Sequence, residues 1–434
     1  MIDVQIIRDN PELVKEKAKQ KGYDIDVQRI MQLDGERKEL LQTVEALRQR
    51  RNEIAESMKA SGGKPDQVAI EEGKQIKVEL AEREGYLAQV ETEWLERIKA
   101  VPNMPLDSVP VGDTEDQNVV VKTVGEQPSF NFEIKNHAQI AEAKGWLDKD
   151  RGAKIAGARF VYLKGDLVRL EFALWQFGMD TVCNQETIQK IIADNNLNVS
   201  DKPFTPVLPP AVAKQEIFEA TGRLNRQEQT YKIEDEDLWL NASAEHTMAP
   251  MYYKEIIDEK ELPIRLIGYT TAFRREAGTY GKDSEGFFRL HQFNKLEMES
   301  FTTADTSLDE HLLMIGIQEH LMQQLGLPYR VLEKCTADIG RPNAKGVDID
   351  VWLPGQNTYR ETHTADYISD FQTRSMQTRV RRTGSGEVEL AHTNDATAFS
   401  QRPLIAIIEN FQTAEGDVVV PEVLRPYLGG RDRI

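Results

Sequence analysis

The sequence predicts an α+β protein in which an antiparallel coiled-coil helical hairpin precedes a domain built on a sheet. Three observations support this expectation. Apolar residues recur at coiled-coil spacing in two long stretches between residues 27 and 100, and a turn-forming segment separates the two stretches. Apolar and polar residues then alternate within residues 268–299, and alternation returns at 347–364, which indicates paired strands. The chain therefore combines a helical pair with strand-rich segments.

Length, cysteine content and charge restrict the class of protein. The 434 residues suffice for a catalytic core and an accessory domain. With two cysteines, Cys183 and Cys335, and no apolar run long enough to cross a bilayer, we expect a cytoplasmic protein that does not enter a membrane. The formal net charge of −18 argues against a protein that coats nucleic acid through its overall field. An RNA partner would have to bind local basic patches.

The first hundred residues are expected to be helical. A short helix is expected after Asn10, because Pro11 suits a first helical turn. Two long helices follow, separated by the turn-forming residues 61–66, and their seams are Leu33, Leu40, Val44, Leu47, Arg51, Ile54 and Met58, and then Ile76, Leu80, Leu87, Val90 and Trp94. At about 1.5 Å per residue each helix would reach roughly 45 Å, so the pair must project into solvent. Taken alone, such a hairpin is typical of interaction or dimerisation devices.

Residues 101–130 are rich in Pro, Gly and Asp and predict a linker between a domain at 1–100 and a core at 131–434. Within the core, residues 159–182 predict a short strand, a turn and an amphipathic helix. Pro209 and Pro210 follow a β-prone run, and prolines there prevent its continuation as a central strand.

The stretch from Gly268 to Glu299 predicts a long hairpin with one functional face. Its return segment places Phe288, Leu290, Gln292, Asn294, Leu296 and Met298 on one face, and Arg289, His291, Phe293, Lys295, Glu297 and Glu299 on the other. Arg274 and Glu276 would join Phe293 and Glu297 on that second face. An arginine fork suits phosphate, an aromatic ring suits a nucleobase, and a carboxylate suits an amine or hydroxyl. A surface hairpin with cross-strand ion pairs is the alternative.

The hairpin sequence carries a specific resemblance. Residues 273–297, FRREAGTYGKDSEGFFRLHQFNKLE, closely resemble motif 2 of class II aminoacyl-tRNA synthetases in the form found in seryl-tRNA synthetases. Residues 204–224 resemble motif 1, which builds the dimer interface of that class, and residues 390–429 resemble motif 3. The resemblance covers nearly the whole chain. By this resemblance the chain is identified as a member of the bacterial-type seryl-tRNA synthetases.

Several properties are implied by this resemblance. It implies a mixed, largely antiparallel sheet flanked by helices, a homodimer, and ATP-dependent ligation of L-serine to tRNA(Ser) through seryl-adenylate with release of AMP and pyrophosphate. The N-terminal arm would grip the tRNA, with the basic cluster Arg48, Arg50 and Arg51 as its contact. Two other activities stay open, namely a paralogue that loads an amino acid on a carrier protein and a non-catalytic RNA-binding regulator.

The resemblance also implies the site residues. L-serine would bind Ser243, Ala244, Glu245, Glu297 and Thr397. ATP would bind Arg274, Arg275, Glu276, Leu290, Phe293, Glu361, Thr362, His363, Thr364 and Arg402, and Mg²⁺ would bind Glu361 and Thr364. Arg274, Glu361 and Arg402 would be catalytic, and Arg402, before a helix expected at 403–410, would stack over adenine opposite Phe293. Glu245 suits an ammonium because a buried carboxylate needs a cation, although a solvated loop position is the alternative.

Two segments depart from the family pattern. The usual Ile-Ser-Ser after the glutamate is replaced by Thr362-His363-Thr364, and we expect His363 to be a packing or surface residue because this reaction class needs no histidine base. The common Asn-Gly-Ser-Gly is replaced by Asp395-Ala396-Thr397-Ala398, and the stretch to Arg402 is one residue shorter than usual. Thr397 retains a hydroxyl for the serine pocket.

Overall fold

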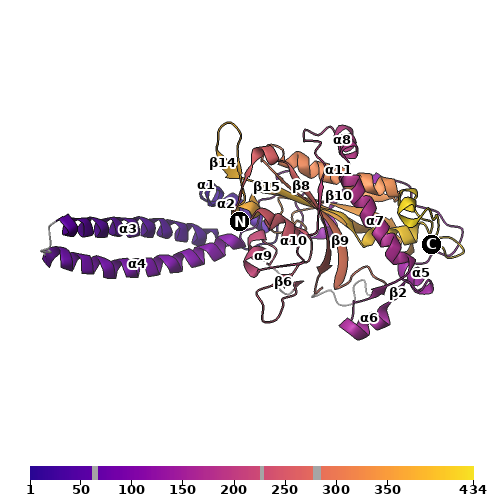
Figure 1. Ribbon diagram of the computed structural model, residues 1–434, viewed down its shortest axis with the longest axis horizontal. Coiled ribbons are helices and arrows are strands. Elements are labelled where there is room, and N and C mark those ends of the chain that lie inside the picture. Colours follow the sequence, from indigo (N-terminus) through magenta and orange to yellow (C-terminus); the bar gives the residue numbers. More distant parts are fainter. Residues whose placement is uncertain (61–66, 225–228, 277–284) are drawn as a thin grey trace. The chain divides into compact units, whose positions relative to one another are not determined.

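The computed structural model describes residues 1–60, 67–224, 229–276 and 285–434. They form two compact units, Met1–Met104 and Pro105–Ile434, which are described separately (Figure 1). No helix in these described ranges is long and apolar enough to span a membrane.

The first unit consists of α1 (Val4–Asp9), α2 (Pro11–Gln20), α3 (Val27–Ala60) and α4 (Gln67–Ala100). The expected short helix is α2, whose first turn holds Pro11 and whose start is capped by Asn10, which accepts a hydrogen bond from the Leu13 amide at 3.1 Å. Helix α1 has no counterpart among the elements expected from the sequence. The Asp3 side chain caps α1 by accepting from the Gln5 amide at 2.8 Å.

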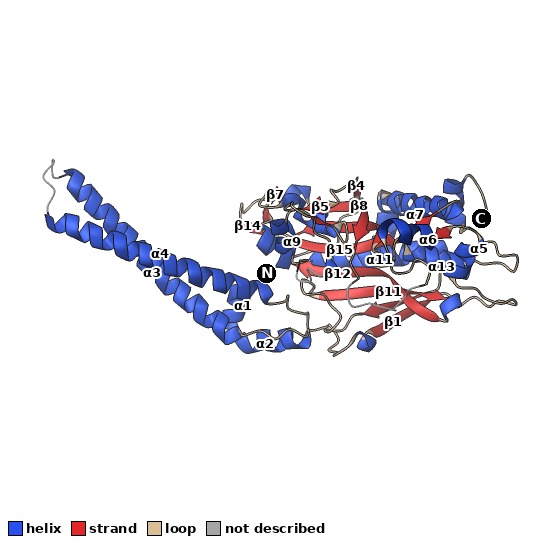
Figure 2. Ribbon diagram, turned by 90° about the horizontal axis from the view of Figure 1, so that it is seen from below, coloured by secondary structure: helices blue, strands red, loops and turns tan. Residues whose placement is uncertain are grey.

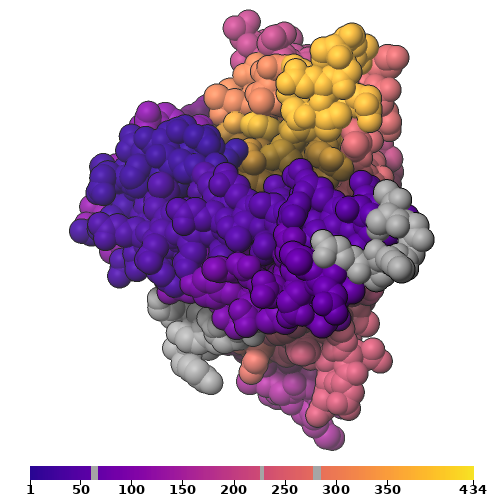
Figure 3. Space-filling view, turned by 90° about the vertical axis from the view of Figure 1, so that its left-hand side faces the viewer, coloured from indigo at the N-terminus to yellow at the C-terminus, as the bar shows by residue number. Residues whose placement is uncertain are grey.

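Helices α3 and α4 confirm the predicted coiled-coil hairpin. One hydrophobic cluster joins their seams through Leu33, Leu40, Val44, Leu80, Leu87 and Val90. Arg51, which the spacing placed on the seam, is exposed instead, because a guanidinium remains in water where it can. Ion pairs such as Arg48 with Glu84 at 2.7 Å link the outer faces. Figure 3 is a space-filling view along this pair, drawn in indigo and violet.

An eight-stranded sheet organises the second unit (Figure 2). Its order is β1 (Val119–Val124), β10 (Tyr329–Glu333), β11 (Lys345–Leu353), β12 (Thr358–Ser369), β15 (His392–Ser400), β9 (Gln292–Thr302), β8 (Ile264–Phe273) and β4 (Thr205–Val207). Every neighbouring pair is antiparallel except β4 with β8, which confirms the mixed, largely antiparallel sheet. β1 lies within the segment predicted as a linker, so part of that segment belongs to the sheet.

Helices α7 (Asp166–Val182), α11 (Ser307–Leu325) and α13 (Arg402–Asn410) pack on the central strands. Smaller helices are α5 (His137–Ala143), α6 (Lys149–Ala156), α8 (Gln185–Asp194), α9 (Gln215–Thr221), α10 (Glu245–Met248) and α12 (Phe371–Met376). Short strands are β2 (Leu147–Asp148), β3 (Tyr162–Leu163), β5 (Val212–Ala213), β6 (Trp239–Leu240), β7 (Ile256–Asp258), β13 (Arg379–Arg381) and β14 (Val388–Leu390). The helix expected at 403–410 is α13, with Pro403 in its first turn.

The two faces of the central strands differ in chemistry. In β9 and β15 alternate residues enter the main hydrophobic core, and these residues are Leu296, Met298, Ala396 and Ala398. The intervening residues line a pocket on the opposite face, and these residues are Lys295, Glu297, Asp395 and Thr397. The pleat of the sheet therefore separates core from pocket.

The central hairpin is shorter than predicted. Its return strand β9 begins at Gln292, whereas alternation was expected from residue 287. Phe287, Phe288 and Leu290 are all buried instead of alternating between two faces. Phe287 and Phe288 are consecutive, and both join the main hydrophobic core, which a regular strand does not allow. Gly286 before them has φ +65° and packs closely on His137, since a Cβ there would lie 2.2 Å from Nε2 of His137. The loop expected before Gly286 lies largely outside the described residues.

Candidate active site

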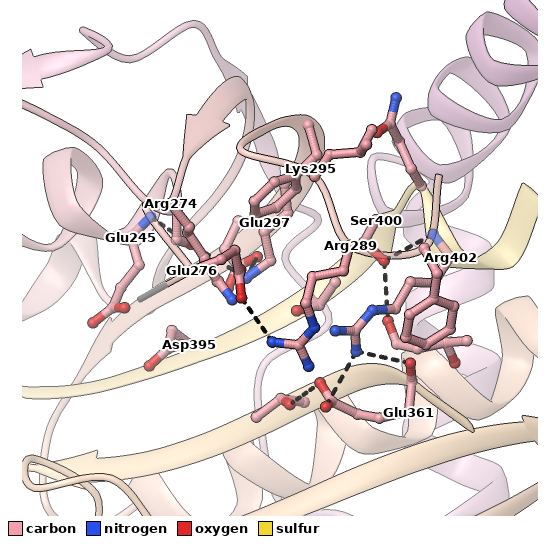
Figure 4. A pocket seen from close by; sticks show the side chains of 18 of the residues that line it. Glu245, Arg274, Glu276, Arg289, Lys295, Glu297, Glu361, Asp395, Ser400 and Arg402 are labelled. Atoms are coloured by element: carbon pink, nitrogen blue, oxygen red, sulfur yellow. Dashed lines mark hydrogen bonds and ion pairs between the residues drawn. The ribbon is translucent and has the colours of Figure 1, made fainter. Parts of the chain in front are cut away.

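A pocket lies on the open face of the sheet, where β8, β9, β12, β15 and the start of α13 meet (Figure 4). Its cavity measures about 220 Å³. A second cavity of about 540 Å³ shares Phe288, Arg289, Glu361 and Arg402 with the first. The two adjoining cavities offer room for a ligand larger than an amino acid.

Glu245 marks one end of the pocket. It is the first residue of α10, and its Oε1 accepts hydrogen bonds from Nε of Arg223 at 2.7 Å and from Nε2 of Gln372 at 2.8 Å. Burial raises the pKa of this carboxyl, but the charge of Arg223 outweighs burial and holds the pKa below its ordinary value. Glu245 is therefore ionised and fixed in orientation.

Glu297 and Lys295 lie beside it on β9. Nζ of Lys295 is 2.5 Å from Oε2 of Glu297 and donates to Oγ of Ser243 at 3.2 Å. Burial raises the pKa of Glu297, although Lys295 opposes the shift. Thr397 on β15 is directly opposite Glu297 in the strand register, so its hydroxyl shares this end of the pocket.

Arg274 follows the last residue of β8. Its backbone amide donates to the His291 carbonyl at 2.9 Å, which extends the hairpin pairing by one step. Its Nε donates to the carbonyl of Ala242 at 3.2 Å, and its guanidinium lies 5.1 Å from the centre of the Phe293 ring. Burial lowers the pKa of Arg274, yet an arginine remains charged at neutral pH. The Arg274 guanidinium is thus held in the pocket by a backbone carbonyl and an aromatic ring.

Arg402 and Glu361 form the other charged pair. Nη1 of Arg402 lies 3.1 Å from Oε2 of Glu361 and donates to the Glu361 carbonyl at 2.9 Å. Burial raises the pKa of Glu361, but the charge of Arg402 brings it down to about 2. The Arg402 guanidinium lies 4.9 Å from the ring of Phe288. Phe293, the ring predicted opposite Arg402, has Arg274 over its face in this structure.

The residues predicted for a divalent cation lie together on β12. Oγ1 of Thr364 is 3.4 Å from Oε1 of Glu361 and donates to Oδ1 of Asp348 at 2.8 Å. Burial raises the pKa of Asp348 to about 8. The described residues contain no group of three or more His, Cys, Asp or Glu side chains arranged for a metal. Mg²⁺ commonly takes one or two protein oxygens together with substrate phosphates, so a carboxylate beside a hydroxyl fits it.

The pocket contains most of the predicted site residues. Those predicted for serine or ATP that line it are Ser243, Glu245, Arg274, Glu276, Leu290, Phe293, Glu297, Glu361, Thr362, Thr364, Thr397 and Arg402. Ala244, Arg275 and His363 are not among the described residues that line it. The predicted residues that share this cavity span 159 positions of sequence, from Ser243 to Arg402.

The three residues outside the pocket have physical reasons for their places. His363 is buried. Its Nδ1 is hydrogen-bonded to Oγ1 of Thr362 at 2.8 Å, and its Nε2 is hydrogen-bonded to the Ala398 carbonyl at 3.0 Å. Burial lowers its pKa to about 3, so it is a neutral packing histidine. The Arg275 side chain is exposed, and Ala244 is buried against Met248. His363 is thus the packing histidine that was expected, and the ATP contacts of Arg275 and His363 and the serine contact of Ala244 stay predictions.

Sequence reasoning did not assign several residues that line the pocket: Arg223, His246, Phe287, Phe288, Arg289, Lys295, Asp366, Asp395, Ser400 and Gln401. Strand alternation had already placed Arg289 and Lys295 on the functional face of the hairpin without giving them a role, and it could also have identified Asp395. Lys295 lies between Phe293 and Glu297 on one face, and Asp395 precedes Thr397 by two residues. Arg223 follows the left-handed Gly222 at the end of α9, and no local pattern connects it with the pocket.

Two family descriptions match this chain. Residues 1–105 match the seryl-tRNA synthetase N-terminal domain. Residues 230–411 match the tRNA synthetase class II core domain (G, H, P, S and T).

Similar proteins are known along the full length of the chain. The serine–tRNA ligase of Geobacter sp. (strain M21) is 38% identical over 437 residues, with 100% of each chain covered. That of Nitrosopumilus maritimus (strain SCM1) is 34% identical over 438 residues, again with 100% of each covered. Among solved structures, the seryl-tRNA synthetase from Pyrococcus horikoshii complexed with ATP has a TM-score of 0.88 at 33% identity, covering 100% of this chain and 99% of that one. The cytoplasmic serine–tRNA ligase from Naegleria fowleri in complex with AMP has a TM-score of 0.82 at 30% identity, covering 100% and 98%.

Proposed function

The chain belongs to the seryl-tRNA synthetase family, and from this premise we infer how its own residues carry out the reaction. The enzyme ligates L-serine to tRNA(Ser) at the expense of ATP through seryl-adenylate and releases AMP and pyrophosphate. One observation supports the assignment of residues that follows. A single pocket is lined, among other side chains, by the guanidinium groups of Arg274 and Arg402, the Phe293 ring, the carboxyl groups of Glu245 and Glu297, and the Thr397 hydroxyl.

L-serine binds at the end of the pocket that contains Glu245, Glu297, Ser243 and Thr397. The ionised Glu245 receives the ammonium group, because a buried carboxylate gains most from a nearby cation. Glu297 and the Thr397 hydroxyl, which face each other across β9 and β15, receive the serine hydroxyl. Ser243, held by Lys295, closes the same end. The Ala244 backbone keeps Ser243 and Glu245 at fixed separation.

ATP occupies the remainder of the pocket. Arg274 binds the α-phosphate, and the adenine lies near Phe293 and Arg402, whose ring and guanidinium group line the pocket. The rest of the nucleotide site consists of Glu276, Leu290, Glu361, Thr362 and Thr364. Arg402 pairs with Glu361, and both side chains line the pocket, which supports contacts of this pair with the nucleotide.

In the first step a carboxylate oxygen of serine attacks the α-phosphorus. A bond forms between this oxygen and phosphorus, and the bond from phosphorus to the bridging oxygen breaks as pyrophosphate leaves. No general base is required because the serine carboxylate is already ionised. Arg274 stabilises the negative charge that grows on the α-phosphate oxygens, and Glu245 and Glu297 keep serine oriented. In the second step the 3′-hydroxyl oxygen of the terminal adenosine of tRNA attacks the seryl carbonyl carbon. The bond from that carbon to the phosphate oxygen breaks, AMP leaves, and the hydroxyl proton is released to water.

Mg²⁺ is proposed to bind Glu361 and Thr364. These residues offer a carboxylate that stays ionised at neutral pH and an adjacent hydroxyl. The ion would supply charge neutralisation to the phosphates of ATP.

We propose that the division of the chain follows function. Residues 1–100 would form the tRNA-binding domain, 101–130 a connection that includes β1, and 131–434 the catalytic domain. The tRNA arm would use Arg48, Arg50 and Arg51. Arg48 and Arg50 form exposed pairs with Glu84 and Glu72 at 2.7 Å, and such pairs are weak enough to exchange for RNA phosphates.

A homodimer through the motif 1 segment is also proposed. β4 is an edge strand of the sheet, and Leu208 beside it is 82% exposed. An apolar side chain so exposed at a sheet edge favours burial against a second copy. Sedimentation velocity measures the mass and decides this point.

The cytoplasmic location stays a prediction.

ATP–pyrophosphate exchange with each of the twenty amino acids tests the proposed activation site. Serine should give the fastest exchange, and a tRNA(Ser) transcript should then become charged. Exchange confined to another amino acid would refute the serine pocket. The two alternatives are not favoured, since the relatives named serine–tRNA ligase match along the whole chain, arm included.

A further inference from the structure

A shallow hollow on the surface of the second unit is lined by basic and apolar side chains. It measures about 480 Å³ and lies where α6 meets the β2–β3 pair. Its lining residues are Asp148, Arg151, Lys154, Ile155, Tyr162 and Lys164. In Figure 1 α6 and β2 lie at the lower edge of this unit. None of these residues lines the active-site pocket, so the hollow is a separate feature of the surface.

The hollow is basic although the protein is acidic. Residues 148–164 contain five lysines or arginines and two aspartates, a surplus of three positive charges, whereas acidic residues outnumber basic ones by 72 to 54 in the whole chain. Asp148 is shared between two of the cations, because its Oδ2 lies 2.7 Å from Nη1 of Arg151 and 3.0 Å from Nζ of Lys164. Asp150 is exposed on α6 and does not line the hollow.

The carboxylates that flank this segment leave the surplus positive. Glu142 pairs with Lys149 at 2.5 Å and so reduces the surplus by one charge. Asp166 is compensated by Arg431 at 2.7 Å, from outside the segment. A positive surface therefore remains, and it attracts a polyanion.

An exposed ring lies among these cations. Tyr162 is 47% exposed, and the neighbouring Ile155 is 71% exposed. Lys154 is exposed and forms no ion pair with any described residue. Cations beside an exposed aromatic ring are what single-stranded nucleic acids bind, because the cations meet phosphates and the ring stacks on a base. The hollow therefore suits RNA with unpaired bases better than it suits a duplex.

The segment that carries the hollow is attached to the hairpin of the active site. The Arg159 carbonyl accepts a hydrogen bond from the His291 amide at 3.1 Å. The Phe160 ring lies beside the His291 ring, with 5.4 Å between their centres. His291 directly precedes β9, which supplies several residues of the pocket.

Alternation along β3 connects the hollow with the pocket. Val161 and Leu163 line a small cavity together with Phe293, and Phe293 also lines the active-site pocket. Tyr162 and Lys164, the intervening positions, line the hollow instead. The hollow is therefore on the outer side of a segment whose inner side packs beside the nucleotide site.

We propose that this hollow binds the unpaired 3′ end of tRNA(Ser), with Lys154 and Arg151 contacting phosphates and Tyr162 stacking on a base. The inference rests on the ligation of serine to tRNA(Ser) by this enzyme, and it adds a second tRNA contact to the one proposed for the N-terminal arm. The terminal 3′-hydroxyl must reach the seryl carbonyl carbon in the pocket, so the nucleotides before it have to lie on a neighbouring surface. The hollow is such a surface, and its charge is complementary to RNA.

Fluorescence anisotropy with the full-length protein tests the proposal, using a tRNA(Ser) transcript and the same transcript without its unpaired 3′ nucleotides. Lys154→Gln should reduce the slope of log Kd against log salt by about 0.7, the value for one phosphate of a single strand, which amounts to about fivefold weaker binding at 0.1 M salt. Tyr162→Ala should weaken binding about fivefold or more, because it removes the stacking surface. Both losses should disappear with the shortened transcript, which lacks the nucleotides that the hollow holds. Serine-dependent pyrophosphate exchange needs no tRNA and reports whether each variant is folded.

Lys190→Gln is the matched control. Lys190 is an exposed lysine on α8, which lies at the upper edge of the unit in Figure 1, and it lines neither the hollow nor the active-site pocket. Its replacement should change Kd for tRNA by less than about twofold.

Three outcomes would overturn the proposal. The first is unchanged tRNA binding by Lys154→Gln, which decides the matter even if Tyr162→Ala fails to fold. The second is an equal loss with both transcripts, which would place the contact on the paired stem. The third is an equal loss with Lys190→Gln, which would show only a general attraction between charges. A wild type that charges tRNA(Ser) together with any of these results refutes this inference alone, whereas a wild type that charges no tRNA(Ser) refutes the proposed function and this inference with it.

Discussion

Replacing Arg274 by lysine should impair catalysis more than any other single conservative change in the pocket. The guanidinium donates through Nε to the Ala242 carbonyl at 3.2 Å and lies over Phe293, which leaves its two terminal nitrogens for phosphate oxygens. Lysine retains the charge. One ammonium cannot hold the Ala242 carbonyl and also span two phosphate oxygens in a planar fork.

The expected loss follows from this geometry. Removing one preorganised donor that meets charge developing in a transition state costs about a hundredfold to a thousandfold in turnover, or about 2.7–4 kcal/mol. Ground-state ATP binding should suffer less, because the positive charge remains in place, and we expect KM for ATP to change by less than about tenfold. Pyrophosphate exchange at saturating serine gives both quantities.

Arg275→Lys is the matched control for this measurement. Arg275 follows Arg274 in the chain, but its side chain is exposed and lines no described part of the pocket. Its replacement should change turnover by no more than about twofold, as is usual for surface positions. If Arg275→Lys lowered turnover more than Arg274→Lys, the register of the hairpin and the roles assigned to its residues would be wrong.

Three further predictions concern serine recognition, the arm and pH. Glu245→Gln should weaken serine binding at least about tenfold more than ATP binding, because it removes the charge that faces the ammonium, and equal losses in exchange assays would contradict this role. Deletion of residues 1–104 should leave serine-dependent exchange nearly intact while tRNA charging collapses, since the main core cluster lies entirely in the second unit; loss of exchange in a folded deletion variant would argue against separate roles. Glu299→Gln should stabilise the protein increasingly as pH rises above the ordinary glutamate pKa of about 4.5. Glu299 is fully buried, neither of its carboxyl oxygens has a hydrogen-bond partner among the described residues, and burial and Asp395 raise its pKa well above the ordinary value. The stability it contributes is complete below its unfolded pKa and is lost as pH rises through the folded pKa, at about 1.4 kcal/mol per unit of difference. Urea unfolding of both proteins across this range measures the change, and parallel curves would refute the prediction.

Local pattern in the sequence determined the elements whose periodicity is long. The heptad spacing from Leu33 to Met58 predicted α3, and alternation around Val347–Leu353 predicted β11. Pro11 and Pro403 marked helix starts because proline suits a first turn. These signals succeed because one face of each element must be buried, and the period of the apolar residues records which face. Motif resemblance then located the residues that share the pocket.

Only the tertiary structure decided which charges meet. The extent of β9 was misjudged before Gln292, because Phe287 and Phe288 both enter the main core and alternation does not indicate this. Arg223 reaches Asp395 across 172 positions of sequence, a contact that no local pattern around either residue indicates. A periodic pattern reports burial of a face, whereas the partner of a buried charge depends on how distant segments fold together. Electrostatic energy depends on those distances in space, so the charge balance of the pocket becomes defined only when the sheet assembles.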